Sequence, residues 1–585
     1  MVSEPVIARP AICLNMIVRN EAHIVQEALD AAAPYISSWV IVDTGSDDGT
    51  QDLIRNHMAE LGIPGELFER PWRNFGHNRT EALTLAQGRG DYIWVLDADD
   101  TVAGTPDFTR LSADIYLMRR RIGTTIYWRS ELLRDGLRAR WVGATHEYFA
   151  TDKPQARVRL EGDYQIEDRQ LSARNRDGLK LANDRDLLLA EVERNPEDAR
   201  SVFYLAQSYF ALGDFVNAHK WYARRVEMGG WDQEIYFSMC RVAESMAKLD
   251  ATWLEVQDAY LRAWEFRPTR AEPLYAVACR NREDQRYQLG RLFAQHAAEI
   301  PFPEQDLLFV RADVYAWRAT DEQAVCAFYL GNHDEAFTLW RRLLARPDIP
   351  DDDRQRIAGN RDACAPAMIE AASSYSDALL QRVATGARDA EVTVSLVAGP
   401  DRSATEQTLN SFLHCCTDVS RVGRFVVVDA GLAAQDRAIL LERYEFLEFA
   451  DSGTRLAQMR EQIDGRLWLH LGQGWRFFAP EDFLTRLTAV LDAEAQVFQV
   501  GINLADATTL TRASAPEQTV RRAPDAGRYV LTDAVARGPA MFDTARLDRA
   551  GVLPGSDPDT ELGRRAAAAG LQTAGLDEVL CITAT

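Results

Sequence analysis

The sequence has few of the features that mark secreted, membrane-spanning or nucleic-acid-binding proteins. Its eight cysteines form no CxxC pair and have no histidine at metal-binding spacing, so we expect packing residues in a reduced, cytoplasmic chain. No uncharged apolar run is long enough to cross a bilayer, and residues 1–10 lack the basic-then-apolar pattern of a signal peptide. The formal net charge of -22 argues against nucleic acid and anionic membrane as broad partners, because both require a positive surface.

The sequence does contain enough apolar material for several folded domains. At 585 residues, 46% of them hydrophobic, the chain is too long for a single core. Its residue patterns change twice along the chain. We therefore predict an α/β domain at 1–182, a helical domain at 183–364, a connector at 365–390 and a second α/β domain at 391–585.

Strands and helices alternate in the first region. Apolar runs at 12–18, 39–42 and 92–96 are separated by segments with helical spacing of their apolar residues. Continuous apolar runs are typical of parallel strands that are covered on both faces. Because open α/β sheets bind ligands beyond the carboxyl ends of their strands, we expect a binding crevice at the ends of these three runs.

Helical periodicity dominates the middle region, which also contains an internal repeat. The segment at 212–218, Leu-Gly-Asp-Phe-Val-Asn-Ala, is echoed at 330–336 by Leu-Gly-Asn-His-Asp-Glu-Ala. A glycine at the turn, an alanine where two helices touch and an aromatic residue one turn later are typical of the tetratricopeptide unit. A generic helical bundle is the alternative, and both interpretations predict a packed helical layer.

An acidic cluster follows the strand predicted at 92–96. Asp97 and Asp99 are separated by one residue, so both side chains can reach one cation where the chain leaves the sheet. Hard oxygen ligands select Mg²⁺ or Mn²⁺, which bridge diphosphate oxygens. The same D-x-D spacing recurs without a preceding strand, which shows how weak the triplet is alone, at 184–186, 351–353 and 557–559. A solvated acidic turn is the alternative at Asp97.

Polar residues near the other strand ends are expected at the same edge. Asn20 and Glu21 follow the first strand, and the Asn20 amide is suited to a nucleobase or ribose, or to capping the next helix. Asp43 ends the second strand, where a carboxylate can accept the imide N–H of uracil or shape the following turn. Asn78 and Arg79 begin a predicted helix, and its N-terminus and the guanidinium both favour an anionic ligand. A surface position for Arg79 is equally compatible with the pattern.

A basic stretch leads into Trp-Val-Gly-Ala-Thr-His-Glu-Tyr at 141–148. His146 is a candidate ligand of the cation or of phosphate, and Glu147 is a candidate base for the proton of an acceptor. A histidine beside a glutamate also occurs as an ordinary hydrogen-bonded pair, and that alternative stays open here.

Together these motifs resemble the family 2 glycosyltransferases of the GT-A fold, in the bacterial and phage type whose short catalytic domain precedes tetratricopeptide-like helices. Order and spacing agree over roughly the first 365 residues. The matching stretches lie at 14–21, 42–50, 70–72, 75–79, 96–100, 143–147, 203–207 and 228–231. Peptide S-glycosyltransferases of bacteriocin pathways look like more distant relatives with the same domain plan.

The resemblance implies a role for each residue of the donor site. Asp43 would meet the nucleobase, Asp97 the ribose, and Asp99 the Mn²⁺ or Mg²⁺ ion, with His146 as a further contact to the metal or the diphosphate.

The resemblance also implies one direct displacement that inverts the anomeric centre. Such a reaction requires a base within hydrogen-bond reach of the attacking group. Glu147 is the expected base, and Asp100 is its competitor.

The last region resembles a degenerate copy of the same domain. Asp429 precedes Ala-Gly as Asp43 precedes Thr-Gly, and 576–580 resembles a stretch near the end of such a domain. The segment at 472–474, Gly-Gln-Gly, stands in the place of Asp97 to Asp99. Because no carboxylate is left to hold a cation, we expect a non-catalytic role in acceptor binding or assembly.

The sequence thus predicts a metal-dependent, inverting glycosyltransferase of the hexosyltransferase type. Its donor would be a nucleotide-sugar, preferably a UDP-sugar, and its acceptor a protein, a peptide or a glycan. A non-catalytic tetratricopeptide scaffold that binds sugar nucleotides is the alternative, and the intact Asp97 and Asp99 pair argues against it. Nucleotidyl transfer would need a Gly-rich basic loop after the first strand, which 19–21 does not supply. The pattern leaves open whether the chain forms homo-oligomers.

Overall fold

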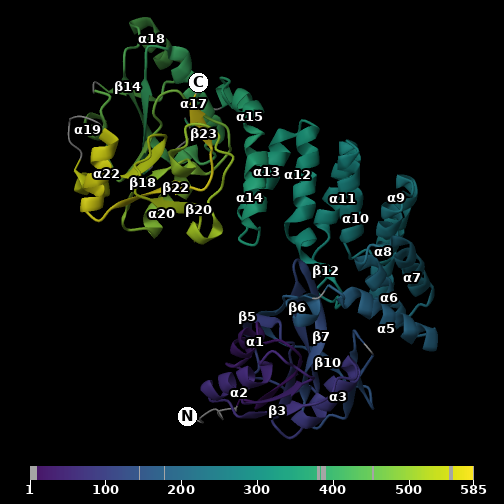
Figure 1. Cartoon of the computed structure of the whole chain (residues 1–585). Coiled ribbons are helices and arrows are strands. Elements are labelled where there is room, and N and C mark those ends of the chain that lie inside the picture. Colours follow the sequence, from purple (N-terminus) through teal and green to yellow (C-terminus); the bar gives the residue numbers. More distant parts are fainter. Residues whose placement is uncertain are drawn as a thin grey trace, which may run out of the picture. The chain divides into compact units, whose positions relative to one another are not determined.

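The structure is a computed structural model that describes residues 9–143, 145–176, 178–378, 383, 391–450, 453–551 and 558–583. The chain forms two compact units, Met1–Asp284 with Leu292–Ala319 and Gln285–Arg291 with Thr320–Thr585 (Figure 1). The division lies within the segment predicted as the helical domain. Residues 379–382 and 384–390 of the predicted connector lie outside the described residues, and its first part forms helix α15, Ala365–Ala372.

The first unit is built on a mixed sheet with the strand order β3-β2-β1-β4-β7-β6-β11-β5. Its first four strands are parallel and β7 joins them antiparallel, while β10 pairs with β6 and β12 with β7. The strands are β1 Ile12–Val18, β2 Ser38–Asp43, β3 Gly65–Glu69, β4 Tyr92–Val95, β5 Asp100–Pro106, β6 Ile115–Ile122, β7 Thr125–Arg134, β10 Arg157–Arg159, β11 Gly162–Asp168 and β12 Val310–Arg311. A separate antiparallel ribbon consists of β8 Ala139–Val142 and β9 Tyr148–Thr151.

Both faces of the parallel strands are covered, as their continuous apolar sequences predict. On one face, Leu14 and Met16 of β1 pack with apolar residues of α1 and α2. On the other face, Cys13 of β1 packs with residues of α3 and of the β8–β9 ribbon. The helices of this part are α1 Val25–Ala32, α2 Thr50–Glu60, α3 Phe75–Ala86 and the short α4 Ala173–Arg176. This packing leaves the carboxyl ends of β1, β2 and β4 at one edge.

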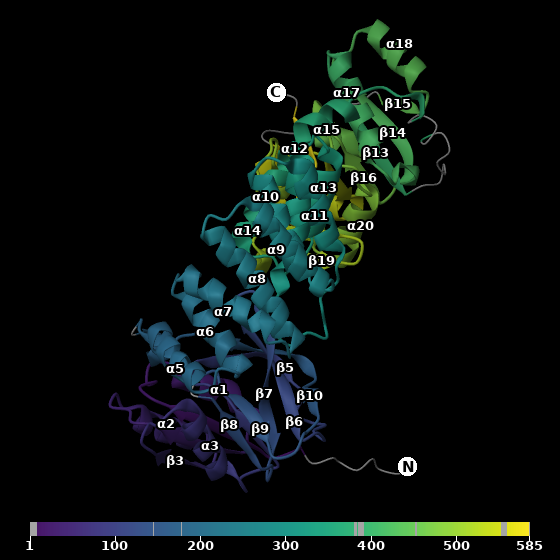
Figure 2. The same cartoon turned by 90° about the vertical axis from the view of Figure 1, so that its right-hand side faces the viewer.

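Consecutive helices from α5 to α10 pack against one another, as α5 to α7 do in Figure 2. The helices in the first unit are α5 Lys180–Arg194, α6 Ala199–Ala211, α7 Phe215–Glu227, α8 Asp232–Lys248, α9 Trp253–Phe266 and α10 Glu272–Glu283. Later helices are α11 Tyr287–Glu299, a π-helical turn at Val314–Arg318, α12 Ala319–Tyr329, α13 His333–Leu344 and α14 Asp351–Asp362. The repeated segments each form a helix–turn–helix with a positive φ at Gly213 or Gly331 and a buried alanine, Ala218 or Ala336. The predicted helical layer and its repeat are therefore confirmed.

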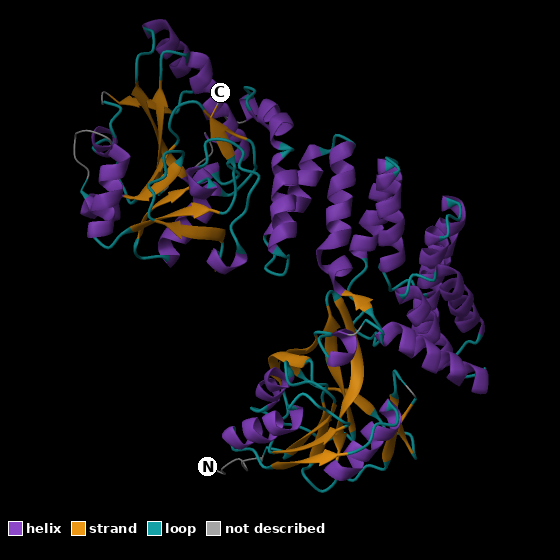
Figure 3. Cartoon of the chain, viewed as in Figure 1, coloured by secondary structure: helices purple, strands orange, loops and turns teal. Residues whose placement is uncertain are grey.

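The second unit contains another region of strands and helices (Figure 3). The order of its main sheet is β15-β14-β13-β16-β21-β18-β22-β20-β19. Its strands are β13 Val392–Ala398, β14 Val422–Asp429, β15 Leu447–Ala450, β16 Leu467–His470, β18 Val497–Gly501, β19 Arg521–Ala523, β20 Gly527–Thr532, β21 Ala540–Asp543 and β22 Gln572–Leu576, with a separate pair of β17 Trp475–Phe477 and β23 Cys581–Thr583. Its helices are α17 Arg402–Cys415, α18 Ala434–Arg443, α19 Leu456–Arg460, α20 Phe483–Ala493, α21 Thr544–Ala550 and α22 Pro558–Ala568, with single-turn helices at Val419–Arg421, Leu504–Asp506 and Glu517–Thr519.

The two sheets share the same topology over five strands. The series β15-β14-β13-β16 is parallel and β21 joins it antiparallel, as β7 joins β3-β2-β1-β4 in the first unit. The predicted α/β, helical and α/β order is thus confirmed. In the part of the chain that the structure describes, no helix combines the length and apolarity needed to span a bilayer.

Candidate active site

A cavity of about 1250 Å³ lies at the carboxyl edge of the first sheet, entirely within the first unit. Strand ends supply residues 17–21 and 97–99, α3 supplies Arg79, and the loop before β9 supplies residues 145–147. The segment 168–175 and helices α5 and α6 complete the wall. A cavity of this size exceeds the usual range for one small ligand, about 300–1000 Å³. The sheet edge and the helical layer therefore enclose one continuous space.

Asp97 is held between two guanidinium groups at the floor of this cavity. Arg79 Nη2 lies 2.5 Å from its Oδ1, and Arg129 Nη2 lies 3.0 Å from its Oδ2. Burial alone would raise the pKa of Asp97, but Arg79 and Arg129 lower it well below the usual value. Asp97 is therefore a fixed carboxylate with its charge balanced by the protein.

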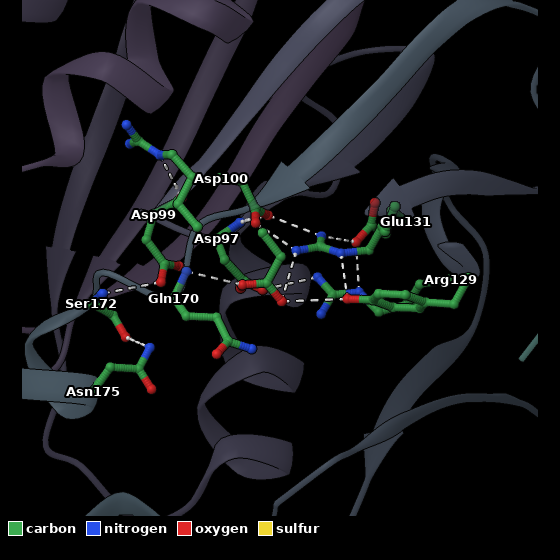
Figure 4. Close-up of polar contacts among 12 residues, drawn as sticks. Asp97, Asp99, Asp100, Arg129, Glu131, Gln170, Ser172 and Asn175 are labelled. Carbon is green, nitrogen blue, oxygen red and sulfur yellow. Dashed lines mark hydrogen bonds and ion pairs between the residues drawn. The ribbon is translucent and has the colours of Figure 1, made fainter. Parts of the chain in front are cut away.

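Asp99 has a different electrostatic environment from Asp97. Its Oδ2 accepts a hydrogen bond from the Ser172 backbone N–H at 3.0 Å, and its backbone carbonyl accepts one from Arg169 Nε at 3.1 Å (Figure 4). Burial and the nearby charge of Asp97 raise the pKa of Asp99. A cation would relieve this repulsion, so Asp99 is the carboxylate of the pair that gains most from binding one.

Asp100 points away from the cavity into a buried ionic network. Its two oxygens pair with Arg120, whose Nη1 also lies 2.6 Å from Glu131 Oε1. Burial would lower the pKa of Arg120, but Asp100 and Glu131 raise it well above the usual value. Glu131 also pairs with Arg129, so the network supports the arginine that holds Asp97. Asp100 is fully buried and does not line the cavity.

Asn20 and Glu21 line the cavity at the end of β1. Asn20 has a positive φ of 60°, and its Oδ1 accepts a hydrogen bond from the Asp47 backbone N–H at 2.9 Å. Glu21 is buried, and burial together with repulsion from Asp99 raises its pKa to about 7. Below pH 7 the Glu21 carboxyl is mostly protonated, so it adds little negative charge beside Asp99.

The side chains of Asp43 and Asn78 form hydrogen bonds with neighbouring loops of the protein. The Asp43 carboxylate accepts hydrogen bonds from the backbone N–H groups of Gly45 and Ser46, from the Ser46 hydroxyl and from the Gln51 amide. Asn78 is fully buried and bonds to the backbone at positions 71 and 73. Neither residue lines the cavity, so the turn-forming interpretation of Asp43 describes its contacts here.

Glu147 and His146 line the same cavity from the loop before β9. Glu147 Oε1 is 2.5 Å from Arg79 Nε, so one guanidinium contacts both Glu147 and Asp97. The His146 ring stacks on Tyr204 of α6, with a centroid distance of 4.1 Å and an interplanar angle of 6°. Arg79 is nearly buried, which decides against the surface alternative for it.

The arrangement does not contain a complete metal cage. Among the residues that the structure describes, no group of three His, Cys, Asp or Glu side chains is placed to hold a metal ion. This donor set still fits Mg²⁺ or Mn²⁺ in a nucleotide site, because such ions take one or two carboxylates and fill the other positions with phosphate oxygens and water. Asp99 is the residue best placed to act as such a carboxylate ligand.

Several cavity residues were not among the predicted site residues. Arg129 on β7, Ser172 before α4, and Arg200 and Tyr204 on α6 all line the cavity. Arg129 belongs to the basic stretch that also contains Arg134, Arg138 and Arg140, a signal that also describes an ordinary solvent-facing segment. Tyr204 lies in the matching stretch 203–207, but that stretch assigned it no role. Only the packing of α5 and α6 beside the sheet brings Arg200 and Tyr204 to the site.

The matching edge of the second sheet is built differently. Asp429 accepts hydrogen bonds from the Gly431 and Leu432 backbone N–H groups, as Asp43 does from its own loop. Gln473 occupies the place of the D-x-D and lies so close to Gly399 that a Cβ there would be 1.8 Å from its Nε2. An amide side chain therefore covers the end of β13, where the first unit has its cavity.

The comparisons with known proteins agree with this geometry. Residues 13–115 match the model of glycosyl transferase family 2, so the first unit carries a domain of that family, as the motifs predicted. A comparison with curated proteins returned no match.

Solved structures with some similarity to the chain include MamA and YrrB. A crystal structure of MamA is 13% identical and covers 29% of this chain and 91% of its own, with a TM-score of 0.24. YrrB, described as a TPR protein with an unusual peptide-binding site, is 16% identical and covers 31% and 82%, also with a TM-score of 0.24. At these scores the likeness carries no argument, and the tetratricopeptide-like character rests on the helix pairs described above.

Proposed function

We propose that the first unit is a metal-dependent, inverting glycosyltransferase that uses a nucleotide-sugar donor, with UDP-sugars preferred. The observation that carries this proposal is the cavity beside the family 2 sheet, which is lined by Asp97, Asp99 and Glu147. The nucleoside diphosphate would lie along the ends of β1 and β4. The acceptor, a protein, peptide or glycan, would enter from the α5 and α6 side.

Asp99 would hold Mn²⁺ or Mg²⁺ in this site. When bound, the ion would offset the negative charge of the diphosphate leaving group. Asp97 would meet the ribose hydroxyls, and Arg79 and Arg129 keep it ionised and fixed. The raised pKa of Glu21 limits additional negative charge near the diphosphate.

The reaction would be a single displacement at the anomeric carbon. The acceptor oxygen or sulfur attacks that carbon as its proton passes to Glu147, and the bond from the carbon to the diphosphate oxygen breaks with its electrons leaving on the diphosphate. The configuration of the anomeric centre inverts. Glu147 is preferred over Asp100 as the base, because Arg120 encloses Asp100 away from the cavity.

The donor site is tested by thermal shift with UDP in the presence and absence of Mn²⁺. We expect UDP to raise the melting temperature of the wild type only when Mn²⁺ is present, and to have no effect on Asp99→Ala. Asp352→Ala, which removes an exposed carboxylate on α14, is the matched control and should behave as the wild type. Equal stabilisation of wild type and Asp99→Ala would refute the assignment.

Turnover is tested with a panel of UDP-glucose, UDP-galactose and UDP-N-acetylglucosamine, with water as the acceptor. Release of UDP from at least one donor, dependent on Mn²⁺ and lost in Asp99→Ala, is the expected result. Binding of UDP without any release from the panel would favour the non-catalytic scaffold instead.

A further inference from the structure

The loop that carries Glu147 is held from the helical layer by three separate contacts. Thr145 Oγ1 donates to Asp184 Oδ1 of α5 at 3.0 Å. The backbone carbonyl of His146 accepts a hydrogen bond from Arg200 Nε of α6 at 3.2 Å. The third contact is the stack between the rings of His146 and Tyr204. Thr145 is thus held by α5 and His146 by α6. Both helices lie outside residues 13–115, which match the family model.

The side chains that contact this loop are themselves held in place, by burial or by neighbouring side chains. Asp184 is buried and pairs with Arg174. The Arg200 guanidinium lies 4.9 Å from the Tyr204 ring centroid and 5.4 Å from that of Tyr148, so it is held between two aromatic rings. Since these side chains lose little additional freedom on contact, they are suited to hold the loop in one position.

The loop conformation requires such support. His146 has a φ of 50°, a left-handed conformation that persists at a non-glycine residue when surrounding contacts determine it. Gly143 has a φ of 120°, and Gly76 at the start of α3 approaches its carbonyl so closely that a Cβ on Gly76 would lie 2.6 Å away. The loop is therefore compressed between α3 on one side and α5 and α6 on the other. Backbone strain of this kind gathers at functional sites.

We propose that Tyr204 and Arg200, on the first helix pair of the helical layer, are positioning residues that set the location of Glu147 relative to the donor. Asp184 has the same role through Thr145. In this arrangement His146 serves as the contact point for α6, and its ring does not act as a metal ligand. The helical layer would thereby be part of the catalytic machinery of the first unit, in addition to framing the acceptor side.

The proposal rests on the proposed function only through the role of Glu147 as the base. Its structural part is independent of any substrate and predicts which contacts order the loop. A 1 Å displacement of a reacting group can reduce a rate by about 100-fold, so small changes at Tyr204 would be visible in turnover.

Hydrogen exchange of the full-length protein tests the structural part. We expect the backbone amides of 143–148 to exchange about 5- to 10-fold faster in Tyr204→Ala and His146→Ala than in the wild type, because the ring stack is lost. Tyr204→Phe keeps the stack and should restore wild-type exchange. Val216→Ala, at a residue of α7 that is 65% exposed, is the control. Wild-type exchange of 143–148 in both alanine variants would overturn the proposal.

Kinetics and donor binding test the functional part, with the UDP-sugar that the wild type turns over fastest. We expect His146→Ala and Tyr204→Ala to lower kcat by about 10- to 100-fold and to change the donor KM by less than about twofold. Tyr204→Phe should retain the wild-type kcat. Both alanine variants should keep the Mn²⁺-dependent stabilisation by UDP. Loss of that stabilisation in His146→Ala would make His146 a metal ligand and overturn the positioning role.

Failure of the proposal and failure of the proposed function give different results. If Asp99→Ala still bound UDP with Mn²⁺, or if Glu147→Gln kept full turnover, the proposed function would be wrong in its site. If Glu147→Gln lost turnover while Tyr204→Ala and His146→Ala retained kcat, the site would stand and the positioning role of α6 would be refuted.

Discussion

Arg79 joins the predicted base to the predicted ribose ligand, since its Nε lies 2.5 Å from Glu147 Oε1 and its Nη2 lies 2.5 Å from Asp97 Oδ1. All three side chains are largely removed from solvent. The loop before β9 and the end of β4 are therefore connected through one guanidinium. Burial by itself would lower the pKa of Arg79, but Asp97 and Glu147 raise it, so the bridge stays charged.

Replacing Arg79 by alanine should destabilise the first unit by about 3–5 kcal/mol, because removal of one partner leaves a buried charge uncompensated. Calorimetric unfolding of the metal-free protein measures this loss. Arg89→Ala is the matched control: Arg89 pairs with Glu66, both half-exposed, and such surface pairs contribute at most about 1 kcal/mol. Equal losses of unfolding free energy in the two variants would show that the Arg79 bridge contributes no more stability than a surface ion pair.

Glu147→Gln should retain Mn²⁺-dependent binding of UDP and lower the transfer rate by about 10²- to 10⁴-fold, since the amide cannot accept the proton of the acceptor. Thermal shift and UDP release measure the two quantities. Glu161→Gln, at an exposed residue, should match the wild type in both. Full turnover in Glu147→Gln would make Asp100 the remaining candidate for the base. We expect Asp100→Asn to lose stability, because the substitution breaks the ion pair with Arg120.

The buried carboxyl of Glu21 should make stability depend on pH. Its pKa is about 7 in the folded protein, whereas an unfolded glutamate has a pKa of about 4.3. A raised folded pKa contributes stability below the unfolded pKa, and this contribution is lost as the pH rises through about 7. Relative to Glu21→Gln, the metal-free wild type should therefore lose up to about 3 kcal/mol between pH 4.5 and pH 8.

Thermal unfolding of both proteins across that pH range checks the Glu21 prediction. The difference in melting temperature between Glu21→Gln and wild type should grow with pH in favour of the variant. A difference that stays constant, or one that shrinks as the pH rises, would mean that Glu21 is ionised throughout.

Asp43→Ala should weaken UDP and CDP binding by similar factors. The Asp43 carboxylate holds the loop after β2 by accepting its N–H groups, so its loss disturbs the cavity edge without regard to the base. Isothermal titration with both nucleotides in the presence of Mn²⁺ measures the ratio. A selective loss of UDP binding would restore the base-reading role.

Asp429→Ala is the matched control for Asp43→Ala, because Asp429 makes the corresponding contacts in the second sheet. We expect this variant to bind both nucleotides as the wild type does, since Gln473 covers the end of the neighbouring strand β13. A drop in nucleotide affinity in Asp429→Ala would assign binding to the second unit as well.

Much of the fold was predictable, because it depends on patterns that are local in sequence. Continuous apolar runs predicted the buried parallel strands, and the repeated Gly-turn and Ala spacing predicted the helix pairs. The roles of individual carboxylates were not predictable in the same way. Asp97, Asp99 and Asp100 lie within four residues of one another. Asp97 lines the cavity paired with two arginines, Asp99 lines it and accepts a hydrogen bond from Ser172, and Asp100 is buried against Arg120. Their partners are 18 to 73 residues away in the chain.

The sequence by itself determined the order of α/β, helical and α/β regions, the family of the first domain and the strand ends at which its polar residues gather. Those properties follow from hydrophobic periodicity and from short motifs. Only the tertiary structure decided which carboxylates remain available and which helix touches the loop before Glu147. Charge and access depend on groups brought together by folding, so the environments of Arg129, Tyr204 and Arg200 are set by packing between distant segments.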